Sequence, residues 1–156
     1  GLTVRENLEV AYSREVNALR NMFSMRAKGC KEKLEEISGK VRLTKRLDVE
    51  AGLLSHGETQ WLEIGMVLMQ DPAILLLDEP VAGMTENEIG LTVDILNTLK
   101  RSHTIILVEH DMGFVRKIAD VVTVLHMGAL LAQGSIEEIE KDESVRAVYL
   151  GTEDAH

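Results

Sequence analysis

Two adjacent carboxylates, Asp78 and Glu79, directly follow the apolar run Ile74–Leu77. A short, continuous apolar run predicts a buried parallel strand, and such strands end at the crevice where α/β proteins bind ligands. In that position Asp78 would hold Mg²⁺ through water, and Glu79 would polarise a water that attacks a γ-phosphate. The alternative is a strand end at the surface with two solvated acids.

Ser55 and Gly57 lie at the start of a predicted amphipathic helix, residues 58–70. Backbone N–H groups at a helix N-terminus can bind phosphate oxygens, which makes this segment a candidate anion site. The alternative is a serine that only caps the helix. Farther along the chain, His110 comes just after a second apolar run, residues 104–108. A histidine there can donate to a γ-phosphate or order a water, and a capping histidine is the alternative.

The elements that must position these residues follow from hydrophobic periodicity. Thr3 and Glu6 have the spacing of a capping box, and residues 12–37 predict one long helix broken near Gly29, or two helices joined there. A short helical turn is predicted near residues 44–47. Beyond residue 54 the predicted helices are 58–70, 85–100, 111–118, 135–140 and 144–150, and the predicted strands are 73–77, 104–108, 121–125 and 129–132. This order predicts an α/β fold with a partly parallel sheet.

The amino-acid composition argues against some classes of function. The 156 residues contain 17 Lys and Arg against 26 Asp and Glu, a net charge of −9, and only 3% are aromatic. An acidic chain with few aromatic residues is poorly suited to a nucleic-acid groove, which needs clustered cations. The single cysteine, Cys30, cannot form an internal disulfide, which fits a reducing compartment. No apolar run approaches the roughly 20 residues that span a bilayer.

Three segments, in this order, resemble the second half of an ABC-type ATPase domain. Leu54–Glu58 is similar to the family's signature motif, Ile74–Glu79 to Walker B, and His110 to the switch histidine. The nearest likeness is to the ATP-binding subunit of branched-chain amino-acid-type importers. Within that group the phrases "LSHGETQWLEIG", "LLLDEPVAGMT" and "VEHDMGFV" resemble the urea-importer member.

The resemblance implies a fold and a division of the chain. The fold class is α/β, a partial P-loop NTPase core with a helical subdomain, in which the Walker A strand and loop are absent. Residues 1–70 would be the helical subdomain with the signature motif, 71–150 the later part of the RecA-like catalytic core, and 151–156 a tail.

The resemblance also implies site residues, cofactors and partners. Two ATPase subunits would sandwich ATP and Mg²⁺, next to membrane-spanning permease subunits at the cytoplasmic face of the cell membrane. The transported solute would be urea or a branched-chain amino acid. The implied roles are metal binding by Asp78, catalysis by Glu79 as base and His110 as γ-phosphate sensor, and cofactor binding by Ser55, His56, Gly57 and Glu58.

The sequence departs from the family pattern at four points. His56 stands where the family usually has Gly, Glu58 where it has Gln, and Thr85 where many members have Asp or Asn. No G-x-x-x-x-G-K-[ST] sequence occurs, and the only Gly-Lys pair is Gly39-Lys40. Without that loop the phosphates lose their backbone cradle and their lysine. We therefore expect an ABC ATPase without its N-terminal part, which by itself neither binds ATP tightly nor hydrolyses it.

Two other functions remain open from the sequence. The first is a non-catalytic module that keeps only an interaction or dimerisation surface. The second is an ABC-type ATPase of DNA repair or chromosome organisation, which the acidic charge disfavours. In addition, the family's phosphate-loop strand lies next to residues 104–108, so its absence predicts an unpaired apolar edge. Such an edge favours a homo-oligomer, for which strand exchange is one route.

Overall fold

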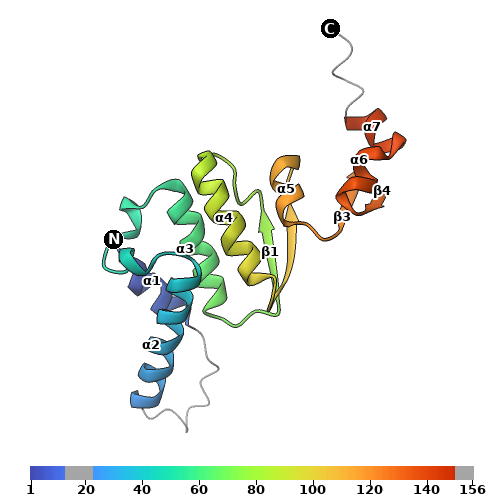
Figure 1. Cartoon of the computed structure of the whole chain (residues 1–156). Helices are drawn as coiled ribbons and strands as arrows, with labels where there is room; N and C mark the ends of the chain where they lie inside the picture. The colour runs from blue at the N-terminus through green and yellow to red at the C-terminus, as the bar shows by residue number, and fades with distance from the viewer. Residues whose placement is uncertain (13–22, 150–156) are drawn as a thin grey trace. The chain divides into compact units, whose positions relative to one another are not determined.

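The computed structural model describes residues 1–12 and 23–149 (Figure 1). The chain divides into two compact units, Gly1–Glu109 and His110–His156, and each is described by itself. The elements of the first unit are α1 (Val4–Ala11), α2 (Phe23–Lys40), the 3₁₀ helices η1 (Thr44–Arg46) and η2 (Ala51–Leu53), α3 (His56–Leu68), β1 (Ile74–Asp78), α4 (Glu86–Leu99) and β2 (Thr104–Val108). Those of the second are α5 (Met112–Ile118), β3 (Val122–His126), β4 (Ala129–Gly134), α6 (Ile136–Lys141) and α7 (Glu143–Tyr149).

Helix α1 begins at the predicted capping box. The Thr3 hydroxyl accepts the N–H of Glu6 at 3.2 Å, and the Thr3 N–H donates to Glu6 Oε2 at 2.7 Å. These two bonds satisfy donors that a helix start leaves without intrahelical partners. Val4 and Leu8 on the next turns are fully buried, and this anchors α1 in the helical core.

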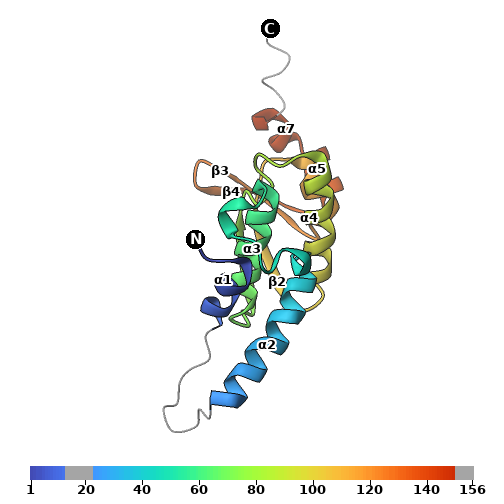
Figure 2. The same cartoon turned by 90° about the vertical axis from the view of Figure 1, so that its left-hand side faces the viewer.

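Helix α2 passes through Gly29 without a break, so the predicted interruption there is wrong. The reason for glycine is a close approach: a Cβ at Gly29 would lie 3.2 Å from the Tyr12 hydroxyl oxygen. Residues 13–22 of the predicted helix lie outside the described residues. The lower end of α2 extends away from α1 and α3 in both views (Figure 2).

Helix α3 packs against α1, α2 and α4 in the first unit. Gly65 allows the tight packing on one side, since a Cβ there would lie 3.2 Å from Leu8 Cδ2 and 3.3 Å from Val41 Cγ2. Close-packed interiors leave no room for an extra methyl group without a shift of these neighbours. The small residue in α3 therefore sets how closely α1 and the end of α2 approach it.

Helices α3 and α4 run next to each other, with β1 beyond α4 (Figure 1). Their contact contains a buried hydrogen bond from Trp61 Nε1 to Thr92 Oγ1 at 2.9 Å, and Thr92 donates in turn to the Glu88 carbonyl at 2.8 Å. Around it α4 buries Ile95, Leu96 and Leu99. The indole N–H thus has its partner inside an apolar contact, where a lost partner is costly.

Strands β1 and β2 pair in parallel, in the register Ile74↔Thr104 to Asp78↔Val108. The parallel pairing confirms the predicted parallel arrangement. The prediction that this sheet is buried on both faces is wrong. Leu75 is buried, whereas Leu76 is 74% exposed and Ile106 opposite it is 51% exposed. Because successive side chains alternate between faces, one whole face of this pair is exposed. Within the described residues the sheet has two strands, so β2 also keeps one edge without a strand neighbour.

The second unit contains a hairpin, formed by the strands predicted at residues 121–125 and 129–132. Strands β3 and β4 pair antiparallel around Met127 and Gly128, which have positive φ values of 49° and 77°. Two consecutive residues in the left-handed region form the turn that matches the strand twist. Ser135 then caps α6 by accepting the N–H of Glu138, and Arg116 of α5 pairs with Glu140 of α6. The short helices predicted after the hairpin are confirmed.

Two findings concern organisation. The compact units divide after Glu109, and α3 and α4 pack together within the first unit, while the subdomain boundary after residue 70 that the resemblance implies stays a prediction. In the described part of the chain, no helix is long and apolar enough to cross a membrane.

The buried Trp61–Thr92 bond leads to a stability prediction. We expect Thr92→Val to lower the free energy of unfolding by about 1–3 kcal/mol, because it leaves the indole N–H buried without an acceptor. Chemical denaturation followed by Trp61 emission measures the change. Thr98→Val is the matched control, since Thr98 is an exposed threonine of the same helix that also bonds the carbonyl four residues back. Equal effects of the two substitutions would contradict this role of the buried bond.

Candidate functional site

The start of α3 is closed by a capping box between Ser55 and Glu58. Ser55 has extended torsions (φ −64°, ψ 168°), and its Oγ accepts the N–H of Glu58 at 3.2 Å. In return, the Ser55 N–H donates to Glu58 Oε2 at 3.0 Å. The Ser-x-x-Glu spacing therefore starts the helix at His56, two residues before the predicted start. Ser55 thus caps α3, and its role in phosphate binding stays a prediction.

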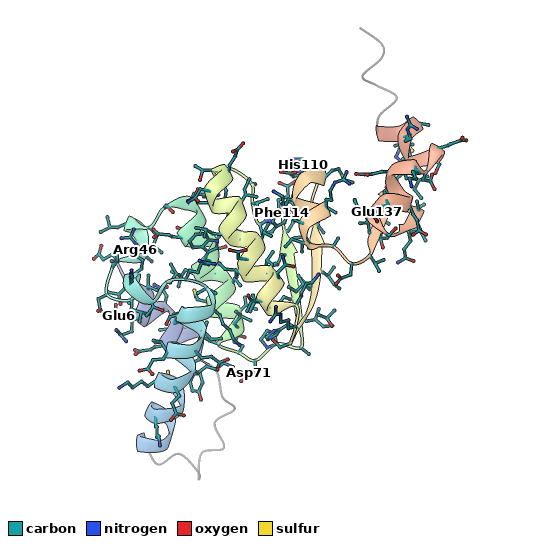
Figure 3. All side chains as sticks on the ribbon, in the orientation of Figure 1. Glu6, Arg46, Asp71, His110, Phe114 and Glu137 are labelled. Atoms are coloured by element: carbon teal, nitrogen blue, oxygen red, sulfur yellow. The ribbon has the colours of Figure 1, made fainter. Side chains whose placement is uncertain are left out.

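Glu58 has a second partner, Arg46, which belongs to the short helix η1 and is labelled in Figure 3. Arg46 Nε donates to Glu58 Oε1 at 2.7 Å, and the Glu58 side chain is only 18% exposed. One oxygen thus caps α3, and the other holds η1 against its first turn. The role of Glu58 in cofactor binding stays a prediction. Arg46 was not found from the sequence, because its partner is 12 residues away in another element.

His56 points toward the segment that follows β1. Its Nε2 lies 2.9 Å from the carbonyl oxygen of Ala82. Next to this contact, Gly83 has a φ of +72°, and a Cβ there would lie 3.6 Å from the imidazole ring. The His56 side chain therefore joins the start of α3 to the segment between β1 and α4.

The carboxylate of Glu88, in the first turn of α4, reaches the same place. Glu88 Oε1 accepts the Ser55 hydroxyl at 2.9 Å and the Gly57 N–H at 3.3 Å. Its Oε2 accepts the Thr85 N–H at 3.0 Å and the Thr85 hydroxyl at 2.8 Å. Donors aimed at a carboxylate favour its charged form. The Thr85 N–H, followed by the hydroxyls of Thr85 and Ser55 and the Gly57 N–H, lowers the pKa of Glu88 from 4.5 to about 2, against an opposing effect of burial.

Asp78 and Glu79 end β1 as predicted, and both are exposed. The Glu79 N–H donates to the Val108 carbonyl at 2.9 Å, which extends the parallel pairing by one residue. Glu79 has a φ of +44°, a left-handed conformation that is uncommon for a residue with a Cβ. Such strain persists where the surrounding structure enforces it, and it concentrates at functional sites. The positive φ of Glu79 changes the chain direction just after Asp78.

His110 is exposed and begins the second compact unit, directly before α5 (Figure 3). The N-cap of α5 is Asp111, whose Oδ1 accepts the Phe114 N–H at 3.0 Å. The N-cap position of α5 is therefore occupied by Asp111 and not by His110. Its predicted role beside Glu79 stays a prediction, since the two residues belong to different units.

In the described part of the chain, no group of three His, Cys, Asp or Glu side chains could hold a metal ion by itself. This is compatible with the expected Mg²⁺. That ion keeps several waters and commonly takes one or two carboxylates together with substrate phosphates. The exposed carboxylate of Asp78 at the strand end fits such a site.

The structure thus brings Ser55, His56 and Gly57 together with the β1–α4 segment, and it adds Glu88. The sequence contained one signal for Glu88, the Thr-x-x-Glu capping box with Thr85, and the structure contains both bonds of that box. It contained no signal that the carboxylate would also reach Ser55, because α3 and α4 meet only through tertiary packing.

Comparison with known proteins shows which sequences and structures this chain is similar to. The sequence profile described as "ABC transporter" matches residues 1–82. The chain is 36% identical over 159 residues to the high-affinity branched-chain amino acid transport ATP-binding protein BraF of Pseudomonas aeruginosa, covering 96% of this chain and 62% of that protein. It is 36% identical over 114 residues to LivG of Salmonella typhimurium, which has the same descriptive name, covering 72% of this chain and 45% of LivG.

A solved structure resembles the fold. The ATP-binding cassette MJ1267 of an ABC transporter superposes with a TM-score of 0.74 at 28% identity, covering 95% of this chain and 62% of that one. The chain therefore spans less than two thirds of the length of each of these relatives.

The depressed pKa of Glu88 leads to a pH prediction. A carboxyl group whose pKa is lowered on folding contributes stability above its unfolded pKa and loses that contribution as the pH falls toward its folded pKa. We therefore expect wild type to melt at a higher temperature than Glu88→Gln at neutral pH, and the difference to shrink as the pH falls below 4.5 toward about 2. Thermal unfolding at a series of pH values measures it.

The control for this experiment is Glu86→Gln, which removes a carboxylate from the same turn of α4. Other acids with lowered pKa, such as Glu6 and Glu138, titrate in all three proteins and cancel in the differences. A difference between wild type and Glu88→Gln that is constant with pH would contradict the assignment.

Proposed function

The chain belongs to the ABC transporter family of ATP-binding proteins, and on that basis we propose that it contributes the signature and Walker B motifs to the ATP-hydrolysing subunit of an importer. One observation carries the proposal. The carboxylates that end β1 are followed by a segment that contacts the start of α3, through His56 and the Ala82 carbonyl at 2.9 Å. A candidate hydrolytic site and a candidate phosphate-binding helix start thus belong to one unit.

In the proposed mechanism the two motifs act on different nucleotides. Ser55 and Gly57 face the nucleotide held by a second subunit, where the hydroxyl and the backbone N–H bind γ-phosphate oxygens. Asp78 would hold Mg²⁺, and the ion when bound would supply positive charge against the phosphates. Glu79 takes a proton from the attacking water, and His110 donates to the γ-phosphate. His56 and Glu58 act by positioning Ser55 and Gly57, through Ala82 and Arg46.

For the solute we propose a branched-chain amino acid or urea. The names of BraF and LivG support the first, while the likeness of three sequence phrases supports the second. Residues 1–70 would contact membrane-spanning permease subunits, with the ATPase subunits at the cytoplasmic face of the membrane.

Walker A chemistry must come from residues other than these 156, since no such sequence occurs among them. We therefore propose that these residues alone neither bind ATP tightly nor hydrolyse it. The same observation favours the second candidate, a non-catalytic interaction module. The two candidates differ in whether the exposed carboxylates of β1 serve any chemistry.

Glu79 is the residue that separates these candidates. In the full-length subunit we expect Glu79→Gln to lower the ATP hydrolysis rate by about 100-fold or more, as loss of a general base does, with nucleotide binding retained. A phosphate-release assay and a nucleotide titration measure the two quantities. Glu63→Gln, at an exposed carboxylate of α3, is the control. Unchanged hydrolysis in Glu79→Gln would exclude its catalytic role and favour the interaction module.

The exposed face of β1 and β2 leads to a prediction about association. We propose that this chain forms a homodimer or a larger oligomer, because Leu76, Ile106 and the open edge of β2 are apolar and exposed. Light scattering over a range of concentrations measures the mass. Ile106→Lys is expected to shift the chain toward the monomer, and Thr98→Lys, at an exposed position of α4, is expected to leave it unchanged. A monodisperse wild-type monomer at high concentration would refute the proposal.

A further inference from the structure

Glu88 links two capping boxes that face each other. Its Oε2 closes the box at the start of α4 with Thr85, while its Oε1 accepts from Ser55 and Gly57 at the start of α3. The approach is close, since a Cβ at Gly57 would lie only 2.7 Å from Glu88 Oε1. A glycine is therefore required for the carboxylate to reach the backbone here.

The donors that Glu88 holds are the donors that the proposed function assigns to a γ-phosphate. A carboxylate oxygen and a phosphate oxygen are both anionic acceptors, and both are favoured by the positive end of a helix dipole. The Ser55 hydroxyl has one hydrogen and the Gly57 N–H has one. Each hydrogen makes one short, well-aligned bond, so the two acceptors compete for the same pair.

We propose that Glu88 is a built-in anionic competitor at the start of α3, which must release Ser55 and Gly57 before the γ-phosphate of a nucleotide on the second subunit can bind there. This inference rests on the proposed function for the identity of the incoming phosphate. Glu88 is a positioning residue: it keeps the two donors ordered and occupied while no nucleotide is present. The dimer in which the start of α3 faces the nucleotide of the second subunit, as distinct from association through the exposed face of β1 and β2, then forms only when a stronger anion replaces Glu88.

The surrounding contacts allow the exchange without movement of the helices. Ser55 and Gly57 donate to Oε1 and Thr85 donates to Oε2, so the exchange has to replace only the bonds to Oε1. The buried Trp61–Thr92 bond keeps α3 and α4 together throughout. The contact between His56 and Ala82 keeps the connecting segment in place. With a pKa of about 2, Glu88 is charged at any physiological pH, so the competitor is always an anion.

The first test uses this chain and inorganic phosphate, followed through the amide NMR signal of Gly57. We expect Glu88→Gln to bind phosphate about tenfold or more tightly than wild type, the size of one charge-assisted hydrogen bond. Gln still serves in a capping box, so the fold should persist, and circular dichroism checks this. Glu86→Gln is the matched control and should behave as wild type. Equal phosphate affinities of wild type and Glu88→Gln would overturn the proposal.

A second variant tests whether the negative charge at position 88 or the contact with Ser55 and Gly57 controls phosphate binding. Glu88→Asp keeps the charge but shortens the side chain by one methylene group, so it should no longer hold both Thr85 and Ser55. We expect its phosphate affinity to lie between wild type and Glu88→Gln. An affinity no higher than that of wild type would mean that local charge, and not the contact to Ser55 and Gly57, governs the site, and this would overturn the proposed competition.

The second experiment uses the full-length subunit in a Glu79→Gln background, where nucleotide is not consumed. We expect Glu88→Gln to lower the ATP concentration for half-maximal dimerisation about tenfold, measured by light scattering. Dimerisation by ATP with the same midpoint in both proteins would overturn the role of Glu88 and leave the proposed function standing. No response to ATP in either protein would refute the proposed function, and with it the nucleotide as the competing anion.

Discussion

The first turn of α3 has backbone donors that no intrahelical carbonyl can satisfy, and much of the first unit is arranged around their acceptors. Ser55 accepts one of them, and Glu88 accepts another from Gly57. Glu58 returns a bond to the Ser55 N–H and holds Arg46. Because Glu88 belongs to α4 and Arg46 to η1, satisfying one helix end joins three elements.

This arrangement makes the candidate phosphate-binding donors depend on how α3 and α4 pack. Trp61 and Thr92 set that packing farther along both helices, within an apolar contact. A change in the helix separation would move Glu88 away from Ser55. The position of these candidate donors thus depends on helix packing to which a buried bond farther along both helices contributes.

The exposed face of the β1–β2 sheet shows what a sequence pattern does not record. Apolar runs such as Ile74–Leu77 predict burial on both faces, and strand position and parallel pairing were predicted correctly. The exposure of Leu76 and Ile106 was not, because a sequence pattern records which side chains are apolar and not what lies against them. Burial depends on a second layer, and a run of residues cannot reveal whether that layer is present.

The amino-acid sequence by itself determined the local features: the capping boxes at Thr3, Ser55 and Thr85, the positions of the strands along the chain, the hairpin turn and the family motifs. These depend on residues within a few positions of each other, so spacing is enough to predict them. The predicted break of the helix near Gly29 was wrong, because the close approach of Tyr12 to this glycine is a tertiary contact. Only the tertiary structure decided that His56 reaches Ala82 and that Glu88 reaches Ser55 and Gly57. Those contacts join residues 26 to 33 positions apart, and they form because α3 packs against α4.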